Sequence, residues 1–192
     1  MENLLEMQNN VKAIIRKYEK DLIKLNVEVW RSIDGYDNYA VSSFGRVKNV
    51  KTGKILKARN DKYGYLRVNL YEYRVMKTHK IHKLVANAFI DNPNNKQCVD
   101  HIDNNKANNH ISNLRFATYK ENNQNSSIST RNTSGCKGIS WNKKAKKWNA
   151  KIKIDGINIH IGYYDNLEDA KTARINRANQ AFGVYTNACE KL

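Results

Sequence analysis

The sequence predicts a chain of the α+β class, in which an N-terminal helix precedes two small regions that contain sheets. Apolar residues recur at helical spacing through the first 25 positions. From Val27 onward they fall in short runs that alternate with polar residues and are separated by glycines. A polar stretch without periodicity, which begins at Ser126, divides the two sheet regions and is typical of a linker.

The first element is an amphipathic helix over residues 4–25. Its apolar stripe consists of Leu4, Met7, Val11, Ile14, Ile15, Tyr18, Leu22 and Leu25. Three heptads are too few to choose between two roles for this stripe. It either caps the following domain, which we favour, or pairs with a second copy to form a homodimer.

Residues 28–99 predict a small meander with a helix near its end. Strands are expected at 28–33, 39–41, 46–50, 65–70 and 77–81, and a helix at 82–89. Leu66, Val68 and Leu70 share one face of the fourth strand, so this face is expected to be buried. A turn is expected at Lys51–Lys54, where Gly53 supplies the positive φ.

The charge distribution indicates a nucleic-acid partner. The 192 residues include 34 Lys and Arg against 18 Asp and Glu, which gives a net charge of +16. Residues 28–99 carry 14 basic and 6 acidic groups, residues 131–192 carry 12 and 5, and residues 100–130 carry 3 of each. Two basic blocks suit a polyanion, although solvated lysines would give the same count. The neutral segment between them suits carboxylates that hold a cation.

Several protein classes are excluded by composition. No apolar run approaches the ~20 residues of a membrane span, and the N-terminus lacks the features of a secretory signal. The cysteines, Cys98, Cys136 and Cys189, form no C-x-x-C pair, which argues against a disulfide framework and a four-cysteine zinc site. We expect a soluble intracellular protein, in a bacterial cytoplasm or, for a virus, in the host nucleus or cytoplasm.

Residues 98–125 carry the candidate chemistry. Thr118 and Glu121 form a capping box, so a helix begins near Tyr119, after strands at 98–101 and 114–117. Strand, loop, strand and helix in this order would bring Asp100 near Asn122, and their oxygens could bind one hard cation. His101 would then lie on the other side of the strand, where it could address a water.

The run VDHIDNNKANNHISNLRFATYKENNQN resembles the motif of HNH homing endonucleases of the phage and intron-encoded type, which have the ββα-metal fold. Upstream, WRSIDGYDNYAVSSFGRV resembles a nuclease-associated modular domain, and IHKLVANAF resembles a segment that commonly precedes the HNH motif. The resemblance implies that Asp100 and Asn122 hold one Mg²⁺ or Mn²⁺, that His101 is the general base, and that Asn113 orients this base. Many members have His where this chain has Asn122, and an amide oxygen suits Mg²⁺ or Mn²⁺ better than zinc.

The implied reaction is phosphodiester hydrolysis that leaves a 5′-phosphate and a 3′-hydroxyl, as a nick or a double-strand break. Alternatives are a catalytically inactive DNA-binding regulator and a protein that acts on RNA. His82 either contacts a phosphate or simply starts its helix, and His110 is expected to be solvated or to brace the loop.

The C-terminal region predicts a three-stranded antiparallel sheet and one helix. Strands are expected at 138–141, 148–154 and 157–163, with a hairpin turn at Asp155-Gly156. A helix is expected to start after Asn166 and to end at Gly183. Its small residues (Ala170, Ala173, Ala178 and Ala181) would pack on an inward sheet face of Ala150, Ile152, Ile154, Ile157, Ile159 and Ile161. The other sheet face would stay open and polar.

This region is similar to the APETALA-type, ethylene-response-factor DNA-binding domain, whose sheet reads double-stranded DNA. The similarity implies that the DNA side carries Lys137, Ser140, Lys151, Lys153, Asn158 and His160. Trp141 would also contact DNA, while Trp148 could equally pack in the sheet. Lys143, Lys144, Lys146 and Lys147 would contact phosphates or form a solvated turn. Plant members have Arg at several positions where this chain has Ser140, Asn158 and His160, which weakens the expectation of sharp specificity.

Four segments follow from these patterns. They are an N-terminal amphipathic helix (1–27), a nuclease-associated motif with an HNH nuclease domain (28–125), a linker (126–134) and a DNA-binding domain (135–192).

Overall fold

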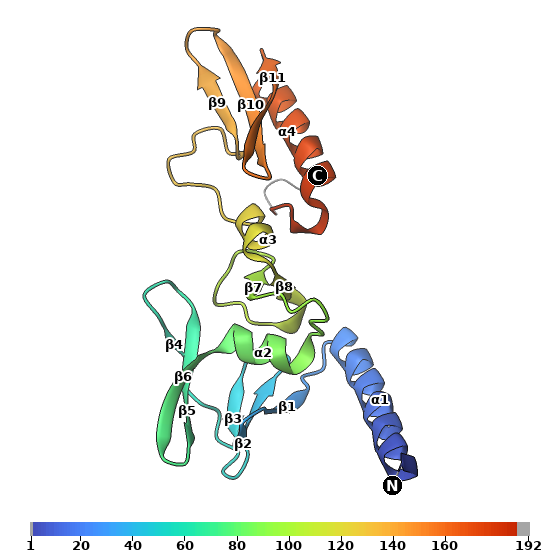
Figure 1. The fold of residues 1–192 in the computed structure, drawn as a ribbon. Helices are drawn as coiled ribbons and strands as arrows, with labels where there is room; N and C mark the ends of the chain where they lie inside the picture. Colours follow the sequence, from blue (N-terminus) through green and yellow to red (C-terminus); the bar gives the residue numbers. More distant parts are fainter. Residues whose placement is uncertain (1, 188–192) are drawn as a thin grey trace. The chain divides into compact units, whose positions relative to one another are not determined.

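The computed structural model describes the backbone of residues 2–187 and the side chains of residues 5–187 (Figure 1). Cys189 lies outside the described residues. Contacts divide the chain into two compact units. The first contains the chain up to Asn94 together with Lys106–Arg115, and the second contains Asn95–Asn105 together with the chain from Phe116 onward. Within the described residues, no helix is both long and apolar enough to cross a membrane.

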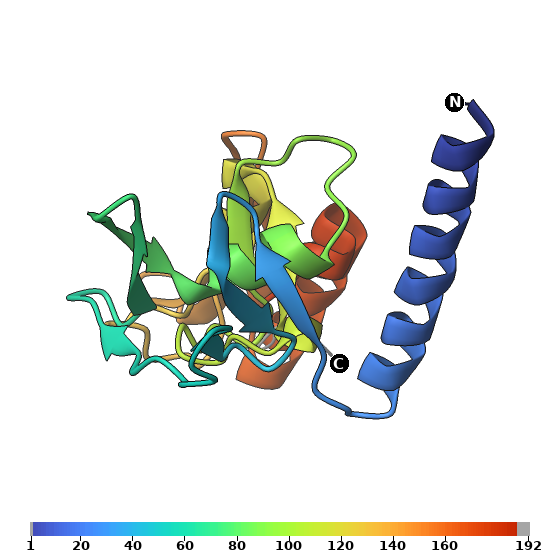
Figure 2. The same ribbon diagram turned by 90° about the horizontal axis from the view of Figure 1, so that it is seen from below.

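The first unit begins with helix α1 (Glu2–Lys24), which confirms the predicted helix. The favoured role of a cap is wrong, because most of its apolar side chains are exposed, Val11 to 54% and Tyr18 to 71%. Figure 2 shows α1 extending away from the sheets of its unit. The C-terminal half of α1 is fastened to the unit, because Arg31 donates both to Glu19 and to the carbonyl of Ala88.

Two three-stranded antiparallel sheets follow in this unit. One contains β1 (Trp30–Ile33), β2 (Tyr36–Ser42) and β3 (Val47–Asn49). The other contains β4 (Arg59–Asn60), β5 (Leu66–Glu72) and β6 (Val75–Lys80), and helix α2 (Ile81–Phe89) follows directly. The predicted strands are confirmed with shifted ends. Strand β4 was not predicted, because two exposed residues show no periodicity. The core includes Val41, Val47, Leu70, Ile81 and Val85, each fully or almost fully buried.

The strand–loop–strand–helix region is also confirmed. It contains β7 (Cys98–His101), a 3₁₀ turn η1 (Ile111–Asn113), β8 (Leu114–Ala117) and α3 (Tyr119–Gln124). Strands β7 and β8 form a two-stranded sheet. The predicted capping box is present, with the Thr118 hydroxyl accepting from the Glu121 amide at 3.2 Å and the Glu121 carboxylate accepting from the Thr118 amide at 2.6 Å.

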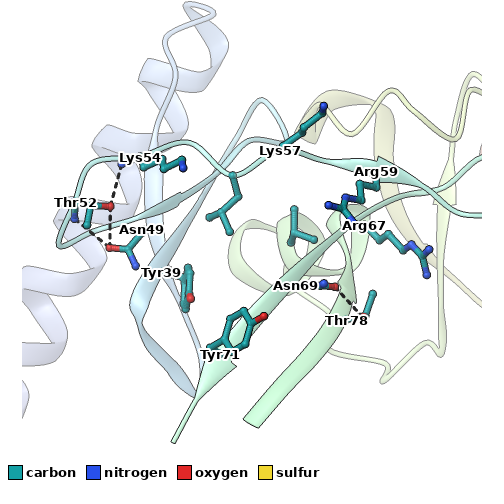
Figure 3. A pocket seen from close by; sticks show the side chains of 12 residues that line it. Tyr39, Asn49, Thr52, Lys54, Lys57, Arg59, Arg67, Asn69, Tyr71 and Thr78 are labelled. Carbon is teal, nitrogen blue, oxygen red and sulfur yellow. Dashed lines mark hydrogen bonds between the residues drawn. The ribbon is translucent and has the colours of Figure 1, made fainter. Parts of the chain in front are cut away.

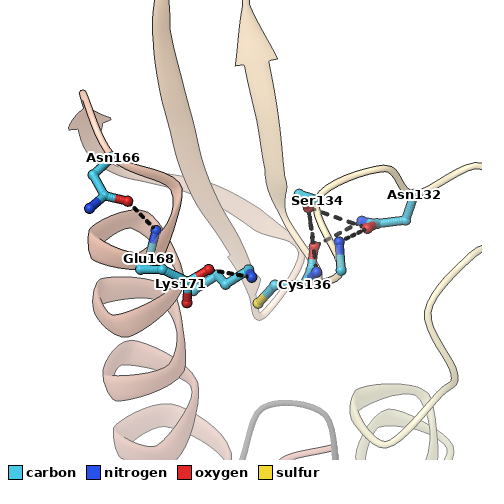
Figure 4. A network of polar contacts seen from close by, with 7 residues as sticks. Asn132, Ser134, Cys136, Asn166, Glu168 and Lys171 are labelled. Carbon is cyan, nitrogen blue, oxygen red and sulfur yellow. Dashed lines mark hydrogen bonds and ion pairs between the residues drawn. The ribbon is translucent and has the colours of Figure 1, made fainter.

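In the C-terminal part of the second unit, the order β11–β10–β9 forms one antiparallel sheet. Its strands are β9 (Ile139–Asn142), β10 (Lys147–Ile154) and β11 (Ile157–Tyr164), and helix α4 (Leu167–Phe182) and 3₁₀ turn η2 (Gly183–Tyr185) follow. Asp155 and Gly156, at φ 53° and 83°, make the predicted hairpin turn. The Asn166 side chain caps α4 by accepting from the Glu168 amide at 2.8 Å (Figure 4).

A polar turn holds the start of this sheet (Figure 4). The buried Ser134 hydroxyl lies 2.9 Å from the carbonyl of Cys136 and 3.1 Å from that of Ile139, and Asn132 donates to the Cys136 carbonyl at 2.8 Å. These bonds satisfy carbonyls beside the small apolar core. The core contains Cys136, Ile139, Ala150 and Ala170, and Trp148, Ile161, Tyr164, Leu167 and Ile175 pack on it.

The predicted alternation of sheet faces holds for most of β10 and β11. Ala150 and Ile152 are buried, whereas Lys151 and Lys153 are exposed. Ile157 was predicted to face inward but is 66% exposed, because it directly follows the hairpin turn. On α4, Ala170 and Ala178 are buried as expected, while Ala181 in the last turn is exposed, contrary to the prediction.

Candidate functional site

The candidate nuclease centre lies at the end of β7. Asp100 and His101 are each only 5% exposed. A buried carboxylate requires hydrogen bonds, and Asn125 supplies them: its amide nitrogen lies 3.0 Å from both carboxylate oxygens of Asp100 and 2.9 Å from the carbonyl of His101. Asn125 is itself 1% exposed and follows directly after α3. Sequence reasoning missed Asn125, which differs from the other asparagines of this region in no local signal.

Asn122, the predicted second metal ligand, lies on α3. It is half-buried and stands three residues before Asn125, which places the two side chains on the same face of the helix. Since Asn125 contacts Asp100, this face is directed toward the end of β7. The predicted helix is present, and a side chain that bonds Asp100 comes from Asn125, three residues after Asn122.

Asn113 and His110 are braces of the loop in the first unit. Asn113 is 7% exposed, and its side chain donates to the Asn108 carbonyl at 2.9 Å. The backbone N–H of Asn113 donates to the His110 carbonyl, also at 2.9 Å. His110 Nδ1 lies 2.7 Å from the Ser112 hydroxyl, and its ring packs on Phe44 with 4.9 Å between centroids. Of the two expectations for His110, these contacts support the loop brace.

A charged cluster fixes the start of α3. Lys96 Nζ donates to Glu121 and to the Tyr185 hydroxyl, both at 2.8 Å. The bond to Glu121, followed by that to Tyr185, raises the pKa of Lys96. Burial alone would raise the pKa of Glu121, but the hydrogen bonds from Lys96 and Thr118 outweigh burial and lower it. Glu121 is therefore held as a carboxylate that accepts from both groups.

The donor atoms at this centre suit a hard divalent cation. Asp100 offers a carboxylate, and Asn122 an amide oxygen. Mg²⁺ is commonly held by one or two carboxylates, with waters and substrate phosphates completing its shell. A carboxylate has about four acceptor positions, so Asp100 can accept from Asn125 and still bind a cation. Among the described residues, no group of three or more His, Cys, Asp or Glu is arranged to hold a metal ion, so a zinc-type ligand set is not formed there.

The outer face of the C-terminal sheet carries five of the predicted DNA-binding residues: Ser140, Lys151, Lys153, Asn158 and His160. Antiparallel pairing sets Lys151 opposite His160, Lys153 opposite Asn158, and Asn149 opposite both Ser140 and Tyr163. A β-bulge between Ala150 and Lys151 places Ile161 outside the register. The bulge reverses the alternation beyond it, which brings Tyr163 to the outer face, where its ring contacts His160 at 4.7 Å.

Other predicted DNA-binding residues lie elsewhere. Trp141 pairs with Trp148 across the strands, with ring centroids 5.2 Å apart, and Trp148 packs on the core, so both lie on the helix-covered face. Lys137 donates to the Gln124 carbonyl at 3.0 Å, at the end of α3. Lys147 pairs with Asp165 at 3.2 Å, and Lys143, Lys144 and Lys146 form the exposed turn that precedes it.

His82 does not occupy a phosphate-binding position. It lies in α2, is 3% exposed, and its ring contacts that of Tyr65 at 5.0 Å. Of its two predicted roles, the structure supports the helix position.

A basic cavity of about 590 Å³ in the first unit was not assigned from the sequence (Figure 3). Its lining comes from β2 to β6 and their connections, and the Asn69 side chain in its wall accepts from the Thr78 hydroxyl at 2.9 Å. The charged lining residues are Lys54, Lys57, Arg59 and Arg67, with Tyr39 and Tyr71 beside them. The spread of these residues over four segments explains why no motif indicated the cavity.

Comparison with known proteins identifies two families along the chain. Residues 28–71 match the NUMOD4 motif, and residues 80–124 match the HNH endonuclease family. HNH endonuclease L245 of Acanthamoeba polyphaga mimivirus is 37% identical over 160 residues, which is 83% of this chain and 41% of that protein. DNA endonuclease I-HmuI of Bacillus phage SP01 is 42% identical over 97 residues, which is 50% of this chain and 56% of that protein.

A solved structure that describes DNA binding and cleavage by the HNH homing endonuclease I-HmuI has 32% sequence identity and a TM-score of 0.49, and the match covers 81% of this chain and 83% of that one. The chain spans less than two thirds of the length of both curated relatives. The chain thus carries a segment, residues 80–124, that matches the HNH endonuclease family, and a segment, residues 28–71, that matches the NUMOD4 motif.

Proposed function

We propose that this protein is a metal-dependent DNA endonuclease of the HNH homing type. It hydrolyses phosphodiester bonds in double-stranded DNA, as a nick or a double-strand break, and leaves a 5′-phosphate and a 3′-hydroxyl. The single observation that carries the proposal is the buried Asp100–His101 pair, with Asn125 bonded to the Asp100 carboxylate. This pair lies within the segment that matches the HNH endonuclease family.

In the proposed reaction His101 is the general base. A neutral imidazole can accept a proton from a water. That water attacks the phosphorus atom, and the 3′ oxygen leaves. Asn113 orients the base by holding the loop that contains Asn108.

Asp100 and Asn122 would hold the cation, Mg²⁺ or Mn²⁺. When bound, such a cation neutralises charge that develops on the phosphate and on the leaving oxygen. Asp100 is buried at the end of a strand and Asn122 lies on a capped helix, so both ligands are carried by regular elements. Ligands on regular elements are held more precisely than ligands on loops.

Two basic surfaces would bind the DNA. The C-terminal domain (135–192) would act as an APETALA-type module that presents Lys151, Lys153, Asn158 and His160 on its outer face. Its amide and imidazole groups can reach base edges, while its lysines neutralise phosphates. The cavity of the first unit, with two lysines and two arginines, would bind the backbone of the same duplex.

The chain would divide by function into a nuclease region (28–125), a linker (126–134) and a DNA-binding domain (135–192). The exposed apolar stripe of α1 would pair with a second copy, and such a homodimer would bring two centres to opposite strands.

Cleavage of supercoiled plasmid tests the function. The protein with Mg²⁺ or Mn²⁺ is expected to convert it to open circles, and EDTA and His101→Ala are expected to prevent this. Linear product in addition would support paired cutting. Intact plasmid in every lane, with tight duplex binding in a gel shift, would instead indicate a DNA-binding regulator and contradict the endonuclease.

A further inference from the structure

The segment after α4 is hydrogen-bonded to three parts of the strand–strand–helix region. The Tyr185 hydroxyl donates to the Phe116 carbonyl of β8 at 3.1 Å and accepts from Lys96, which precedes β7, at 2.8 Å. Two residues later, the Asn187 amide donates to the carbonyls of Asn125 and Ser126, the latter at 3.0 Å. The segment therefore joins the chain just before β7, strand β8 and the chain that follows α3.

Helix α3 depends on bonds at its ends. It has six residues, and an isolated helix of this length is unstable in water. The last carbonyls of a helix have no partner within the helix. The capping box secures the N-terminal end, and Asn187 bonds to the chain immediately after the C-terminal end. Asn187 therefore holds the backbone at Asn125, the residue that directly follows the helix.

The amide of Asn125 can adopt only one orientation in this environment. Its nitrogen faces the two carboxylate oxygens of Asp100 and the carbonyl of His101, all of which only accept. Its side-chain oxygen faces amide nitrogens of Asn104 at 3.5 Å and Asn187 at 3.4 Å. Asn187 therefore contacts both the backbone and the side chain of the residue that holds Asp100.

Both side chains in this contact are shielded from water. Asn125 is 1% exposed and Asn187 is 3% exposed, so water does not readily replace either side chain. The neighbouring Thr186 is also buried and bonds the Ala178 carbonyl of α4 at 3.3 Å. The segment is thereby tied to the C-terminal helix as well as to the nuclease centre.

From these contacts we propose that Asn187 is a positioning residue of the nuclease centre, which acts through Asn125 on the carboxylate of Asp100. The C-terminal domain is then a structural part of the metal site as well as a DNA-binding module. The inference rests on the proposed function, because Asp100 is a ligand only if the protein binds the cation. Groups that hydrogen-bond a metal ligand commonly change metal affinity or activity by roughly 10–100-fold when they are removed.

The test uses the full chain and Mn²⁺. Binding of Mn²⁺ to the protein without DNA is measured by electron paramagnetic resonance, and single-turnover nicking is measured over a range of Mn²⁺ concentrations. Asn125→Ala is expected to weaken Mn²⁺ binding by roughly 10–100-fold. Asn187→Ala is expected to weaken it less and to regain the wild-type nicking rate at saturating Mn²⁺, while its DNA affinity in EDTA is unchanged.

Two control variants test whether the loss of any asparagine side chain in this region weakens Mn²⁺ binding. They are Asn123→Ala, on α3, and Asn176→Ala, on α4, and both side chains are exposed in the wild type. Both variants are expected to bind Mn²⁺ like the wild type. If Asn187→Ala does not fold by circular dichroism, Asn187→Ser, which keeps one donor, takes its place and is expected to show a smaller loss of affinity.

The two proposals fail in different ways. If the wild type and Asp100→Ala bind Mn²⁺ equally and neither nicks DNA, the proposed function is wrong. If the wild type binds and nicks, Asp100→Ala loses both, and the folded Asn187 variants bind Mn²⁺ like the wild type, the positioning role is wrong. A lowered melting temperature with unchanged Mn²⁺ affinity also overturns it, since a purely structural residue gives that result.

Discussion

Removal of two lysines from the outer face of the C-terminal sheet tests whether this face binds DNA. Lys151 and Lys153 are exposed, stand two residues apart on β10, and lie opposite His160 and Asn158. Their side chains point away from the core, so Lys151→Gln/Lys153→Gln is expected to fold normally. The change removes two positive charges without changing the length of the side chains much.

The expected magnitude follows from counterion release. Each phosphate that is neutralised contributes about 0.9 to the slope of log affinity against log salt. If both lysines contact phosphates, the slope falls by about 1.8 in the double variant. Over a fourfold rise in salt, from 50 to 200 mM, the ratio of the wild-type to the variant association constant therefore falls about 12-fold.

Fluorescence anisotropy with a labelled duplex, in EDTA and at five or more salt concentrations, measures this slope. The charge-matched control is Lys171→Gln/Arg177→Gln on α4, which covers the other face of the sheet. The control is expected to retain the wild-type slope within experimental error. Equal slopes for the wild type and the Lys151/Lys153 variant, or an equal fall in the control, would refute binding by the outer face.

Three further predictions follow. His101→Ala is expected to lower the single-turnover nicking rate by roughly 10²–10⁴-fold with unchanged DNA affinity in EDTA; a rate within twofold of wild type would exclude a general base at this position. Asn166→Ala removes the side chain that accepts from the Glu168 amide and is expected to cost about 1 kcal/mol of unfolding free energy in urea, whereas Asn166→Asp, which can still cap, is expected to cost little. Burial, and after it the charge of Lys77, lowers the pKa of His79 in the folded protein. As the pH falls through ~6.5, the unfolded chain therefore binds a proton at this position more readily than the folded chain, which lowers the stability of the fold. Between pH 7.5 and 5.5 the melting temperature is expected to fall less steeply in His79→Gln than in the wild type.

Features set by neighbouring residues could be predicted from the sequence. The capping box of α3 and the Asp155-Gly156 hairpin depend on residues at most three positions apart, and both are present in the structure. The alternation of β10 was also predictable, because apolar and polar residues alternate along a strand that has one buried face. The rule does not extend along β11 beyond Ile161, where a bulge reverses the faces and exposes Tyr163.

The positions of the site residues could be predicted only in part. The motif indicated Asp100 and a helix that faces it, but the partner of the Asp100 carboxylate, Asn125, is one of several asparagines in that segment. The contact between Asn125 and Asn187 joins residues 62 positions apart. A pattern within a short segment carries no information on such a contact. The prediction that α1 caps its domain was wrong for a related reason, because an apolar stripe has the same sequence pattern whether or not another part of the protein covers it.

The distribution of charge favours affinity over selectivity in the proposed DNA complex. Lysine is a flexible point charge, whereas the fork of arginine bonds guanine through two donors. The outer face of the C-terminal sheet presents lysines, with Asn158 and His160 as its groups for base edges. Each base-specific contact of a good bidentate type discriminates by only ~1–3 kcal/mol, so this face alone would distinguish few positions. If the cavity of the first unit binds the same duplex, as proposed, linkage of the two surfaces would raise the affinity without adding base contacts, and a target with several substitutions would still be bound.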